Sequence, residues 1–416
     1  MGRTIVIVGT LDTKGEEIGY LKQTVDMRGH DSLVIDCGVV GEPTFVPEIT
    51  RQEVARAAGT SLDELVMLED ERKAMDVMAL GAAKLVGKLY SNERLDGILA
   101  IGGSMGTKLG LSVMDILPIG VPKLMVSTIA FAPFFMRYAG SELIKKDLTM
   151  MQSAVDFWGM NSVVKGILDS AVGAITGMVE MKEEKPAKPL IGITTLGGVA
   201  CNYVPLIKPL VEARGYELVV FHTVGIGGRY FEEFVEQGAL AGVLDLSTHE
   251  VMEELYGGAN LGAGRDRMEA AARKGIPQVV SPGCLDFFAW RGPVETFPPH
   301  LKRRIENRKI HIHSGFTIPI RASKEEMAQA GKTMAEKLNK AIGPAVVLIP
   351  TKGFEERDKP TGVFYDPEAN RGFTKALKKH IRPGIKVTEL DLHINDKAFA
   401  EAAVGTLFNM MEKTTD

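Results

Sequence analysis

The stretch that most constrains the fold of this chain runs from Asp96 to Gly110 and reads DGILAIGGSMGTKLG. Its apolar run, Ile98 to Ile101, is typical of a fully buried strand in a parallel sheet, and it ends at paired glycines before a helical pattern begins. A strand, a glycine turn and a helix N-terminus in this order expose backbone N–H groups at the positive end of the helix dipole. The stretch therefore predicts a seat for an anion, most often a phosphate. The candidate residues of this seat are Gly102, Gly103, Ser104, Gly106 and Thr107.

The same motif also fits a plain strand-to-helix turn whose glycines serve only close packing. It is not a Walker A loop, because no Gly-Lys-Ser/Thr closes it, and it is not G-x-G-x-x-G, because its paired glycines are adjacent. The case for a nucleotide therefore depends on what the neighbouring strand ends carry.

Length and composition limit the class of protein. A chain of 416 residues is too long for one ordinary hydrophobic core, so we expect two domains or three. The 45 glycines are more than the usual share of about 7%. A net charge of −4 and the absence of a basic stripe interleaved with aromatic residues predict no nucleic-acid partner.

Cysteine usage and the chain start bear on location. Cys37, Cys201 and Cys284 are far apart and form no C-x-x-C pair, which fits a reducing compartment. The start, MGRTIVIVGT, leads straight into a strand without the pattern of a signal peptide, and no apolar run approaches the ~18 residues of a spanning helix. We expect a cytoplasmic protein with no membrane partner.

The first half of the chain alternates strand and helix patterns. Strands are predicted at Thr4 to Gly9, Ser32 to Gly38, Gly97 to Ile101 and Pro122 to Thr128, with helices between them. This rhythm predicts a parallel, doubly wound sheet, in which ligands bind at the carboxyl ends of the strands. The candidate nucleotide-binding residues outside the glycine turn are Gly9, Thr10, Asp12, Thr13, Lys14, Gly38, Ser127, Thr128 and Asn161.

Two of these residues have specific expected roles. Lys14 would act as a point charge on a phosphate, and Asp12 would hold Mg²⁺ directly or through water. The alternative is that Asp12 and Thr13 cap the following helix, that Lys14 is a solvated first-turn residue and that Asn161 only caps the long helix after it.

A charged, proline-bearing segment, EMKEEKPAKP, then divides the chain. We expect an N-terminal Rossmann-like nucleotide-binding domain at 1–182, a linker at 183–189 and a C-terminal Rossmann-like substrate domain at 190–416. Strands of the second domain are predicted at Leu190 to Thr195, Glu217 to Thr223, Gly242 to Ser247, Gln278 to Pro282, Ala345 to Ile349 and Ile385 to Leu390. The expected fold class is α/β, with two doubly wound domains and mostly parallel sheets.

The strand ends of the second domain are polar and glycine-rich, which predicts a small-molecule pocket. The candidate substrate-binding residues are Thr195, Gly227, Gly228, Arg229, Thr248, His249, Gly283, His313 and Arg321. The pair His311 and His313 fits a general base, a metal ligand or satisfied polar packing, but no third ligand stands at motif spacing, so no metal site is assigned. Cys284 is favoured as a buried, inert thiol over a nucleophile.

Ordered blocks along nearly the whole chain resemble the ATP-binding domain family typified by the plant inhibitor of tomato mosaic virus replication. The blocks are IVGTLDTKGEE, IDCGV, IGGSMGTKLG, VDFWGMNSV, VFHTVGIGGR, GVLDLST, IPQVVSPGCLD, AEKLNKA, FYDPEAN and HIND. The resemblance implies a two-domain α/β protein that binds ATP in its first domain and self-associates as a homodimer. The plant protein's antiviral binding is a special use and is not expected here.

Two functions follow as expectations. The first is an enzyme in which ATP, held with Mg²⁺ by the first domain, reacts with a small polar metabolite bound by the second; phosphoryl transfer depends on positioning and charge neutralisation. The second is a nucleotide-sensing binding protein without turnover.

Overall fold

The structure is a computed structural model, and it describes residues 2–133, 135, 146–181, 186–198, 200–256, 262–313 and 317–415. The chain divides into two compact units, Met1–Glu184 and Lys185–Asp416, and each is described by itself below. Of the expected linker at 183–189, the first three residues lie outside the described residues.

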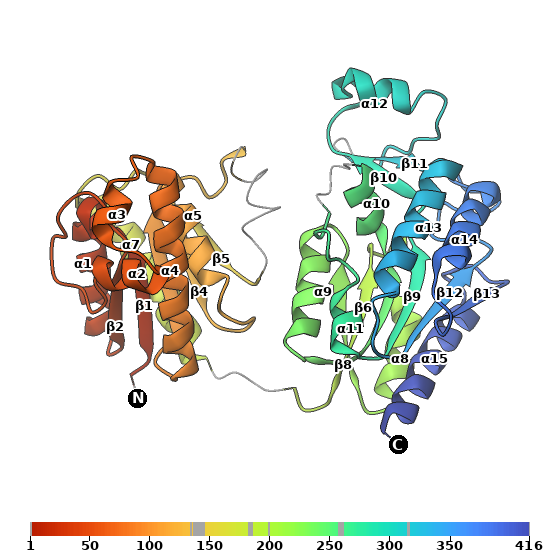
Figure 1. The fold of residues 1–416 in the computed structure, drawn as a ribbon, viewed down its shortest axis with the longest axis horizontal. Coiled ribbons are helices and arrows are strands. Elements are labelled where there is room, and N and C mark those ends of the chain that lie inside the picture. The colour runs from red at the N-terminus through yellow and green to blue at the C-terminus, as the bar shows by residue number, and fades with distance from the viewer. Residues whose placement is uncertain are drawn as a thin grey trace. The chain divides into compact units, whose positions relative to one another are not determined.

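The first unit contains a five-stranded sheet in the order β2-β1-β3-β4-β5, and every pairing in it is parallel (Figure 1). The expectation of a doubly wound parallel sheet is confirmed. The short fifth strand was not predicted, because its sequence TMMQ has no strand pattern of its own. The strands are β1 (Thr4–Gly9), β2 (Asp31–Asp36), β3 (Gly97–Gly102), β4 (Lys123–Ser127) and β5 (Thr149–Gln152).

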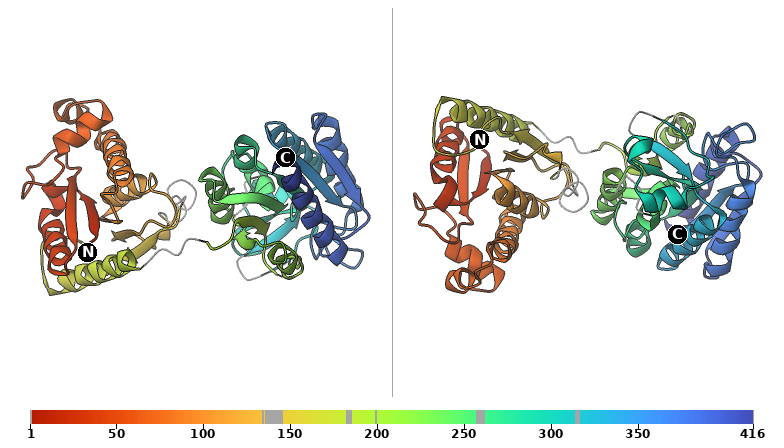
Figure 2. Two further views of the ribbon diagram at one scale, coloured as in Figure 1. Left: turned by 90° about the horizontal axis from the view of Figure 1, so that it is seen from below. Right: turned by 90° about the horizontal axis from the view of Figure 1, so that it is seen from above.

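Helices cover both faces of this sheet, with α7 along one side and the orange helices on the other (Figure 2). Odd positions of β1, Ile5 and Ile7, are buried against α1 and α7, while Val6 and Val8 are buried against the helices of the opposite face. Because side chains alternate across a strand and both faces are covered, the strand is apolar throughout. The helices are α1 (Leu11–Met27), α2 (Arg51–Ala58), α3 (Leu62–Val66), α4 (Glu71–Ser91), α5 (Ser104–Met114) and α7 (Ser162–Glu180).

Helix α7 corrects the expectation that no segment approaches the length and apolarity of a membrane span. Among the described residues it is the one helix that passes such a test by length and composition, with a mean hydropathy of 1.3. Its residues Leu168, Val172 and Ile175 are fully buried in the first unit. The apolar stripe of α7 therefore belongs to the core of an α/β unit. A buried core helix can be as long and as apolar as a membrane span.

The second unit contains a six-stranded parallel sheet in the order β13-β12-β9-β8-β6-β7. An antiparallel pair, β10 and β11, lies below α12 in the upper part of this unit in Figure 1, and the sequence patterns did not predict it. The strands are β6 (Leu190–Thr195), β7 (Glu217–His222), β8 (Leu240–Ser247), β9 (Gln278–Gly283), β10 (Phe287–Trp290), β11 (Ile318–Arg321), β12 (Ala345–Pro350) and β13 (Lys386–Leu390).

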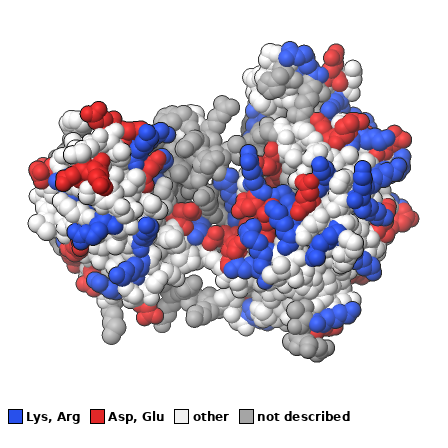
Figure 3. All heavy atoms as spheres, viewed as in Figure 1, with Lys and Arg blue, Asp and Glu red and all other residues white. Residues whose placement is uncertain are grey.

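The second sheet also has helices on both faces, and two hydrophobic clusters meet it from opposite sides. On the surface that Figure 3 shows, acidic and basic side chains are interspersed over this unit. Its helical elements are α8 (Val204–Glu212), α9 (Ile226–Glu236), α10 (His249–Tyr256), α11 (Ala270–Lys274), the 3-10 helix η1 (Val294–Thr296), α12 (Pro299–Arg304), α13 (Lys324–Leu338), α14 (Pro367–His380) and α15 (Lys397–Thr415).

Candidate functional site

A cavity of about 570 Å³ lies where strands β1 and β3 end in the first unit. These neighbouring strands lead to helices on opposite faces, so the cavity stands at the topological switch point of the sheet. Eight of the fourteen predicted nucleotide-binding residues line it. The lining residues are Thr10, Asp12, Thr13, Lys14, Val39, Val40, Gly41, Leu65, Val66, Glu69, Asp70, Glu71, Ala74, Met75, Ile101, Gly102, Gly103, Ser104, Met105 and Gly106.

Helix α5 begins at this cavity without a side-chain cap, because its N-cap residue is Gly103. The backbone N–H of Thr107 donates to the carbonyl oxygen of Gly103 at 2.8 Å. The N–H groups of Ser104, Met105 and Gly106 donate to no other residue in the described part of the chain. Three amide donors at the positive end of an eleven-residue helix thus remain open toward the cavity.

The paired glycines have different roles. A Cβ atom on Gly102 would lie 2.7 Å from the Cα of Gly106, so this residue allows the strand and the helix to approach closely. A Cβ on Gly103 would meet only the Oγ1 of Thr128, at 3.7 Å, and would leave the protein undisturbed. Gly103 therefore keeps open the space in front of the amides.

Thr107 and Ser127 are fully buried and do not line the cavity. Their hydroxyl oxygens lie 2.7 Å apart, and the backbone N–H of Ile129 donates to Ser127 Oγ. This hydrogen bond joins β4 to the first turn of α5. The structure gives both residues a positioning role, where sequence analysis expected direct contact with the nucleotide. Gly9, Gly38, Thr128 and Asn161 are likewise outside the lining.

Asp12 holds its carboxylate against the loop that follows β2. Its Oδ2 accepts the backbone N–H of Gly41 at 3.3 Å, and its Oδ1 is buried without a hydrogen-bond partner. A Cβ on Gly38 would lie 2.8 Å from the Asp12 carboxyl carbon, so glycine makes room for this carboxylate. Among the described residues, only one of the two Asp12 carboxylate oxygens therefore has a hydrogen-bond partner.

Lys14 is not the free point charge that the sequence suggested. Its ammonium group donates to the carbonyl oxygen of Phe157 and lies 5.9 Å from the ring centroid of Trp158. Lys14 therefore links the cavity wall to the loop before α7. Asn161 caps α7 by accepting the N–H groups of Val163 and Val164, which agrees with the capping alternative.

Asp36, at the end of β2, organises this edge and was not named from the sequence. Its Oδ1 accepts the backbone N–H of Leu11 at 2.9 Å and that of Gly38 at 2.8 Å. Burial raises the pKa of the Asp36 carboxyl, although these two amides oppose the shift. An aspartate directly after an apolar strand was the available sequence signal.

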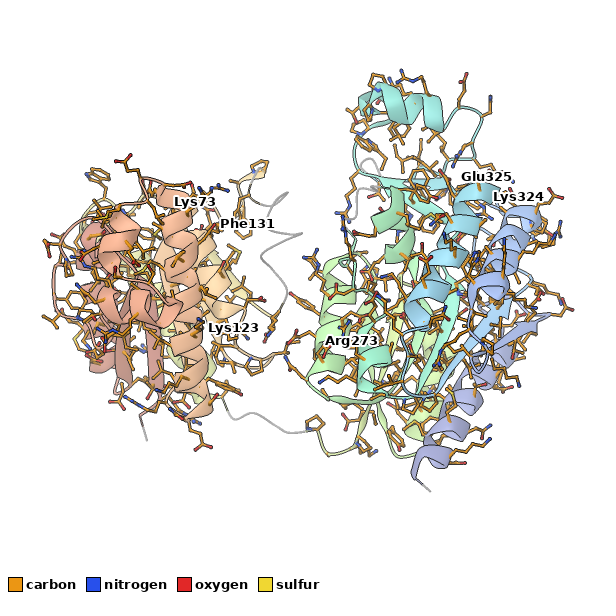
Figure 4. All side chains as sticks on the ribbon, viewed as in Figure 1. Lys73, Lys123, Phe131, Arg273, Lys324 and Glu325 are labelled. Carbon is orange, nitrogen blue, oxygen red and sulfur yellow. The ribbon has the colours of Figure 1, made fainter. Side chains whose placement is uncertain are left out.

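The outer wall of the cavity comes from α3, α4 and the loop between them, which sequence analysis also missed. Val66 of α3 and Val40 of the loop after β2 line the cavity with 49% and 81% of their surface exposed, so the rim is apolar and uncovered. Glu69, Asp70 and Glu71 add negative charge. Asp70 caps α4 through the N–H of Lys73, which Figure 4 labels at the first turn of that helix.

In the second unit a cavity of about 350 Å³ lies at the corresponding edge of the sheet, next to β10 and β11. Of the nine predicted substrate-binding residues, only His249 and His313 line it. The lining residues are Leu196, Gly197, Gly198, Ala200, His222, Val224, His249, Phe287, Ala289, Arg291, His313, Thr317, Pro319 and Arg357.

The glycine turn before α9 looks like an anion seat in sequence, but the protein fills it itself. The backbone N–H groups of Gly225 and Gly228 donate to Glu250 Oε1 at 2.6 and 3.1 Å. A Cβ on Gly227 would lie 1.7 Å from the carbonyl oxygen of His222, and one on Gly228 would lie 1.8 Å from Glu250 Oε2. The Gly228 amide, expected to bind substrate, is therefore occupied by a carboxylate of α10, and Gly227 is required for close packing against the backbone of His222.

The other predicted residues of this unit are held by structural contacts. Thr195 and Thr248 are buried, and Thr248 Oγ1 donates to the Ser281 carbonyl oxygen. Gly283 packs against the backbone of Leu246. Arg229 donates to the Gly262 carbonyl oxygen, while the buried Arg321 donates to the carbonyl oxygens of Phe364 and Asp286 and to Asn370 Oδ1. None of these five lines the cavity.

Glu250 belongs to a buried charge cluster centred on Arg267. The Arg267 guanidinium donates to Asp245 through two bonds of 2.7 Å, to Glu250 at 2.8 Å and to Glu232 at 3.1 Å. One cation therefore faces three carboxyl groups. Burial, the largest cause, raises the pKa of Glu232 to about 7, although Arg267 and the amides of Ala270 and Met268 oppose it.

This pKa predicts how stability changes with pH. Between about pH 4.5 and 7 an unfolded chain releases the Glu232 proton while the folded protein keeps it, so Glu232 makes the free energy of unfolding fall as pH rises. We expect Glu232→Gln to show a shallower fall of melting temperature over this window than the wild type. Glu236→Gln, on the exposed face of the same helix, is the control and should keep the wild-type slope. Equal slopes for wild type and Glu232→Gln would contradict the prediction.

Comparison with known proteins shows the family to which the chain belongs. The N-terminal domain of "Uncharacterised protein family (UPF0261)" matches residues 3–184, and the C-terminal domain of the same family matches residues 188–411. A UPF0261 protein of Clostridium tetani is 41% identical over 416 residues, covering 99% of this chain and all of that protein. The "ToMV resistance protein Tm-1(GCR237)" of Solanum lycopersicum is 32% identical and covers 99% of this chain, but the match spans 56% of that protein.

Solved structures give weaker similarity. The "S. aureus MnaA-UDP co-structure" aligns with 67% of this chain and 79% of its own, at 12% identity and a TM-score of 0.23. A Listeria monocytogenes structure titled as a UDP-N-acetylglucosamine 2-epimerase gives the same coverage and a TM-score of 0.24. Scores at this level carry no argument about function, so the two cavities have to be interpreted from their own residues.

Proposed function

Because this chain belongs to the uncharacterised protein family UPF0261, we propose its function from the geometry of its own cavities: the first unit binds ATP, and the protein is an ATP-dependent enzyme acting on a small polar metabolite. The observation that carries the proposal is the set of three open amides of Ser104, Met105 and Gly106 at the switch-point cavity. These amides lie at a helix N-terminus at the switch point of the sheet, which is the place where doubly wound sheets bind phosphate groups.

The rest of the cavity supports a nucleoside attached to those phosphates. Val39, Val40, Leu65, Val66 and Met75 form an apolar part of the cavity wall. An uncovered apolar rim next to a set of amide donors suits a ligand with a flat, weakly polar base and an anionic end. The volume of about 570 Å³ lies within the range of small-molecule and cofactor sites.

Mg²⁺ fits the acidic side of this cavity. Asp12 Oδ1 is buried without a partner, and Glu69, Asp70 and Glu71 add negative charge that a free polyphosphate would find unfavourable. Within the described residues there is no group of three or more side chains that could hold a metal alone. One carboxylate together with phosphate oxygens is the usual way in which proteins hold Mg²⁺, and the ion would neutralise phosphate charge there.

The proposal is tested by thermal-shift titration of the full chain with ATP, ADP, AMP and GTP, with and without Mg²⁺. Binding to the folded state raises the melting temperature in proportion to the logarithm of ligand concentration. We expect ATP with Mg²⁺ to give the largest shift. Absence of any shift with all four nucleotides contradicts nucleotide binding.

Asp12→Asn separates the metal from the nucleotide. Asparagine keeps the shape beside Gly38 and a carbonyl oxygen for the Gly41 amide, but it removes the charge. We expect Mg²⁺ to strengthen ATP binding in the wild type and to have little effect in Asp12→Asn, as measured by calorimetry. Asp31→Asn, at the opposite end of β2, is the matched control. An unchanged Mg²⁺ effect in Asp12→Asn would exclude Asp12 as the metal ligand.

A nucleotide-sensing protein without turnover is the second candidate, and the contact of Lys14 favours it. The Lys14 ammonium is bound to the carbonyl oxygen of Phe157, so a phosphate that attracted Lys14 would release the loop carrying the exposed Trp158. Measurement of phosphate release from ATP with a metabolite panel distinguishes the two functions. Turnover supports the enzyme, and saturable binding without turnover supports the sensor.

The remaining expectations are carried forward as proposals. A homodimer is tested by sedimentation of the full chain, and a cytoplasmic location by fractionation of cells.

A further inference from the structure

The two cavities differ in the charge that lines them. Among the residues that the structure describes, the cavity of the first unit has four acidic residues and one lysine in its lining, whereas that of the second unit has no Asp or Glu. Two arginines and three histidines line the second cavity: Arg291, Arg357, His222, His249 and His313. Its volume of about 350 Å³ is near the lower limit for ligand pockets, which favours a small ligand.

Arg357 is fixed in this cavity by aromatic and acidic neighbours. Its guanidinium carbon lies 4.8 Å from the ring centroid of Phe287 and 5.2 Å from that of Phe364. Its Nε donates to both oxygens of the buried Glu355, at 3.1 and 3.0 Å. The two terminal amino groups donate to no other residue in the described ranges, and 16% of the side chain is exposed. A planar fork held in this way loses little entropy when it binds an oxyanion through two hydrogen bonds.

Two histidines complete a set of polar groups at the same cavity. His222, at the end of β7, is exposed, and partial burial of its ring lowers the pKa of the imidazole, which favours the neutral form with one donor and one acceptor. His313 is exposed beside β11. Gly197, in the turn after β6, has a φ of 88°. A Cβ atom added to it would lie 3.5 Å from the His222 ring, so this turn passes close to His222.

His249 is fully buried and supports the floor of the cavity. Its Nδ1 lies 2.8 Å from the carbonyl oxygen of Cys284, and its Nε2 lies 2.9 Å from Glu253 Oε1. Its ring lies 4.5 Å from that of Phe287, the same ring that Arg357 covers. His249 therefore fixes Phe287 beneath the guanidinium.

We propose that this cavity binds the oxyanion group, carboxylate or phosphate, of a small metabolite, with Arg357 as its anion-binding residue and His222 and His313 beside it. The inference rests on the proposed function, because it assigns the chemical class of the second ligand. It replaces Arg229, Thr248 and Arg321 in that role, since all three are held elsewhere.

The experiment uses the two tryptophans of the chain as separate reporters. Trp290 lies in β10 beside Ala289 and Arg291 of the second cavity, while Trp158 contacts Lys14 in the first unit. In full-length Trp158→Phe, Trp290 fluorescence is titrated with mono-, di- and tricarboxylates and, in a separate arm, with inorganic phosphate. We expect one of the two arms to give a saturable change, and the arm that responds identifies the anion.

Arg357→Lys keeps the charge beside Glu355 and the alkyl stem between the rings, but it loses the planar fork. In this variant we expect affinity to fall by at least about tenfold. His313→Ala, at an exposed position, should give a smaller loss of about two- to tenfold. The matched control is Arg214→Lys, because Arg214 lies 5.0 Å over the Phe408 ring outside this cavity, and it should bind as the parent does.

Two outcomes overturn the inference: no response in either arm, or equal affinity in Arg357→Lys and Arg214→Lys. Failure of the ATP proposal gives a different result. Nucleotide titration of Trp290→Phe, which keeps Trp158, would then show no change in fluorescence, while the anion titration of Trp158→Phe would still saturate.

Discussion

Gly103→Val abolishes ATP-dependent stabilisation while the protein stays folded. The new side chain stands in front of the open amides of Ser104, Met105 and Gly106, where a phosphate would otherwise accept their hydrogen bonds. Hydrogen bonds to charged groups contribute about 1.5–3 kcal/mol each, so losing one weakens binding by about ten- to a hundredfold and losing two by about a hundredfold or more. Calorimetric titration with ATP and Mg²⁺ measures this loss.

The folded state of this variant is expected to persist, because a Cβ on Gly103 meets only Thr128 Oγ1 at 3.7 Å and the backbone there is extended with a negative φ of −81°. Gly166→Val is the matched control, since Gly166 lies on the exposed face of α7 with nothing within 4 Å of an added Cβ. Equal ATP affinity in both variants would remove the glycine turn from the site.

Arg267→Met destabilises the second unit more than any other single change considered. The side chain is 1% exposed and faces three carboxyl groups, so methionine leaves Asp245, Glu232 and Glu250 buried without their shared cation. Removal of one partner from a buried ion pair costs about 3–5 kcal/mol, a large part of the stability of a typical domain. Urea unfolding followed by Trp290 fluorescence in the Trp158→Phe background measures it.

Arg273→Met is the control for that variant. Arg273, labelled in Figure 4, pairs with Glu236 at 2.6 Å on the surface, and the arginine side chain is 45% exposed. Exposed pairs contribute about 0–1 kcal/mol, so the unfolding midpoint should change little. Similar midpoints for Arg267→Met and Arg273→Met would mean that the buried cluster is neutral to stability.

Sequence patterns predicted both sheets apart from the short edge strand β5, because strand burial on both faces leaves a continuous apolar run. Each predicted strand of the first unit, such as Gly97 to Ile101, overlaps an observed one, and the parallel α/β architecture is confirmed. The ribbon of β10 and β11 escaped prediction, since its segments are short and separated by a long insertion. The pairing of Phe287 with Arg321 is a long-range contact that no local pattern reports.

The candidate sites were only partly predictable, for a different physical reason. A glycine turn in the sequence predicts exposed backbone amides, but it does not predict which group binds them. The turns before α5 and α9 look alike, yet the first has open amides and the second binds Glu250 from α10. Arg357 and Arg267 carry no sequence signal, because their roles arise from aromatic and acidic side chains that folding brings together.

The most direct test is a crystal structure of the full chain with a non-hydrolysable ATP analogue and Mg²⁺. The account predicts phosphate oxygens within hydrogen-bond distance of the backbone N–H groups of Ser104, Met105 and Gly106, and the base against the wall formed by Val40 and Val66. Nucleotide bound elsewhere on the chain, with these three amides still open, would contradict it.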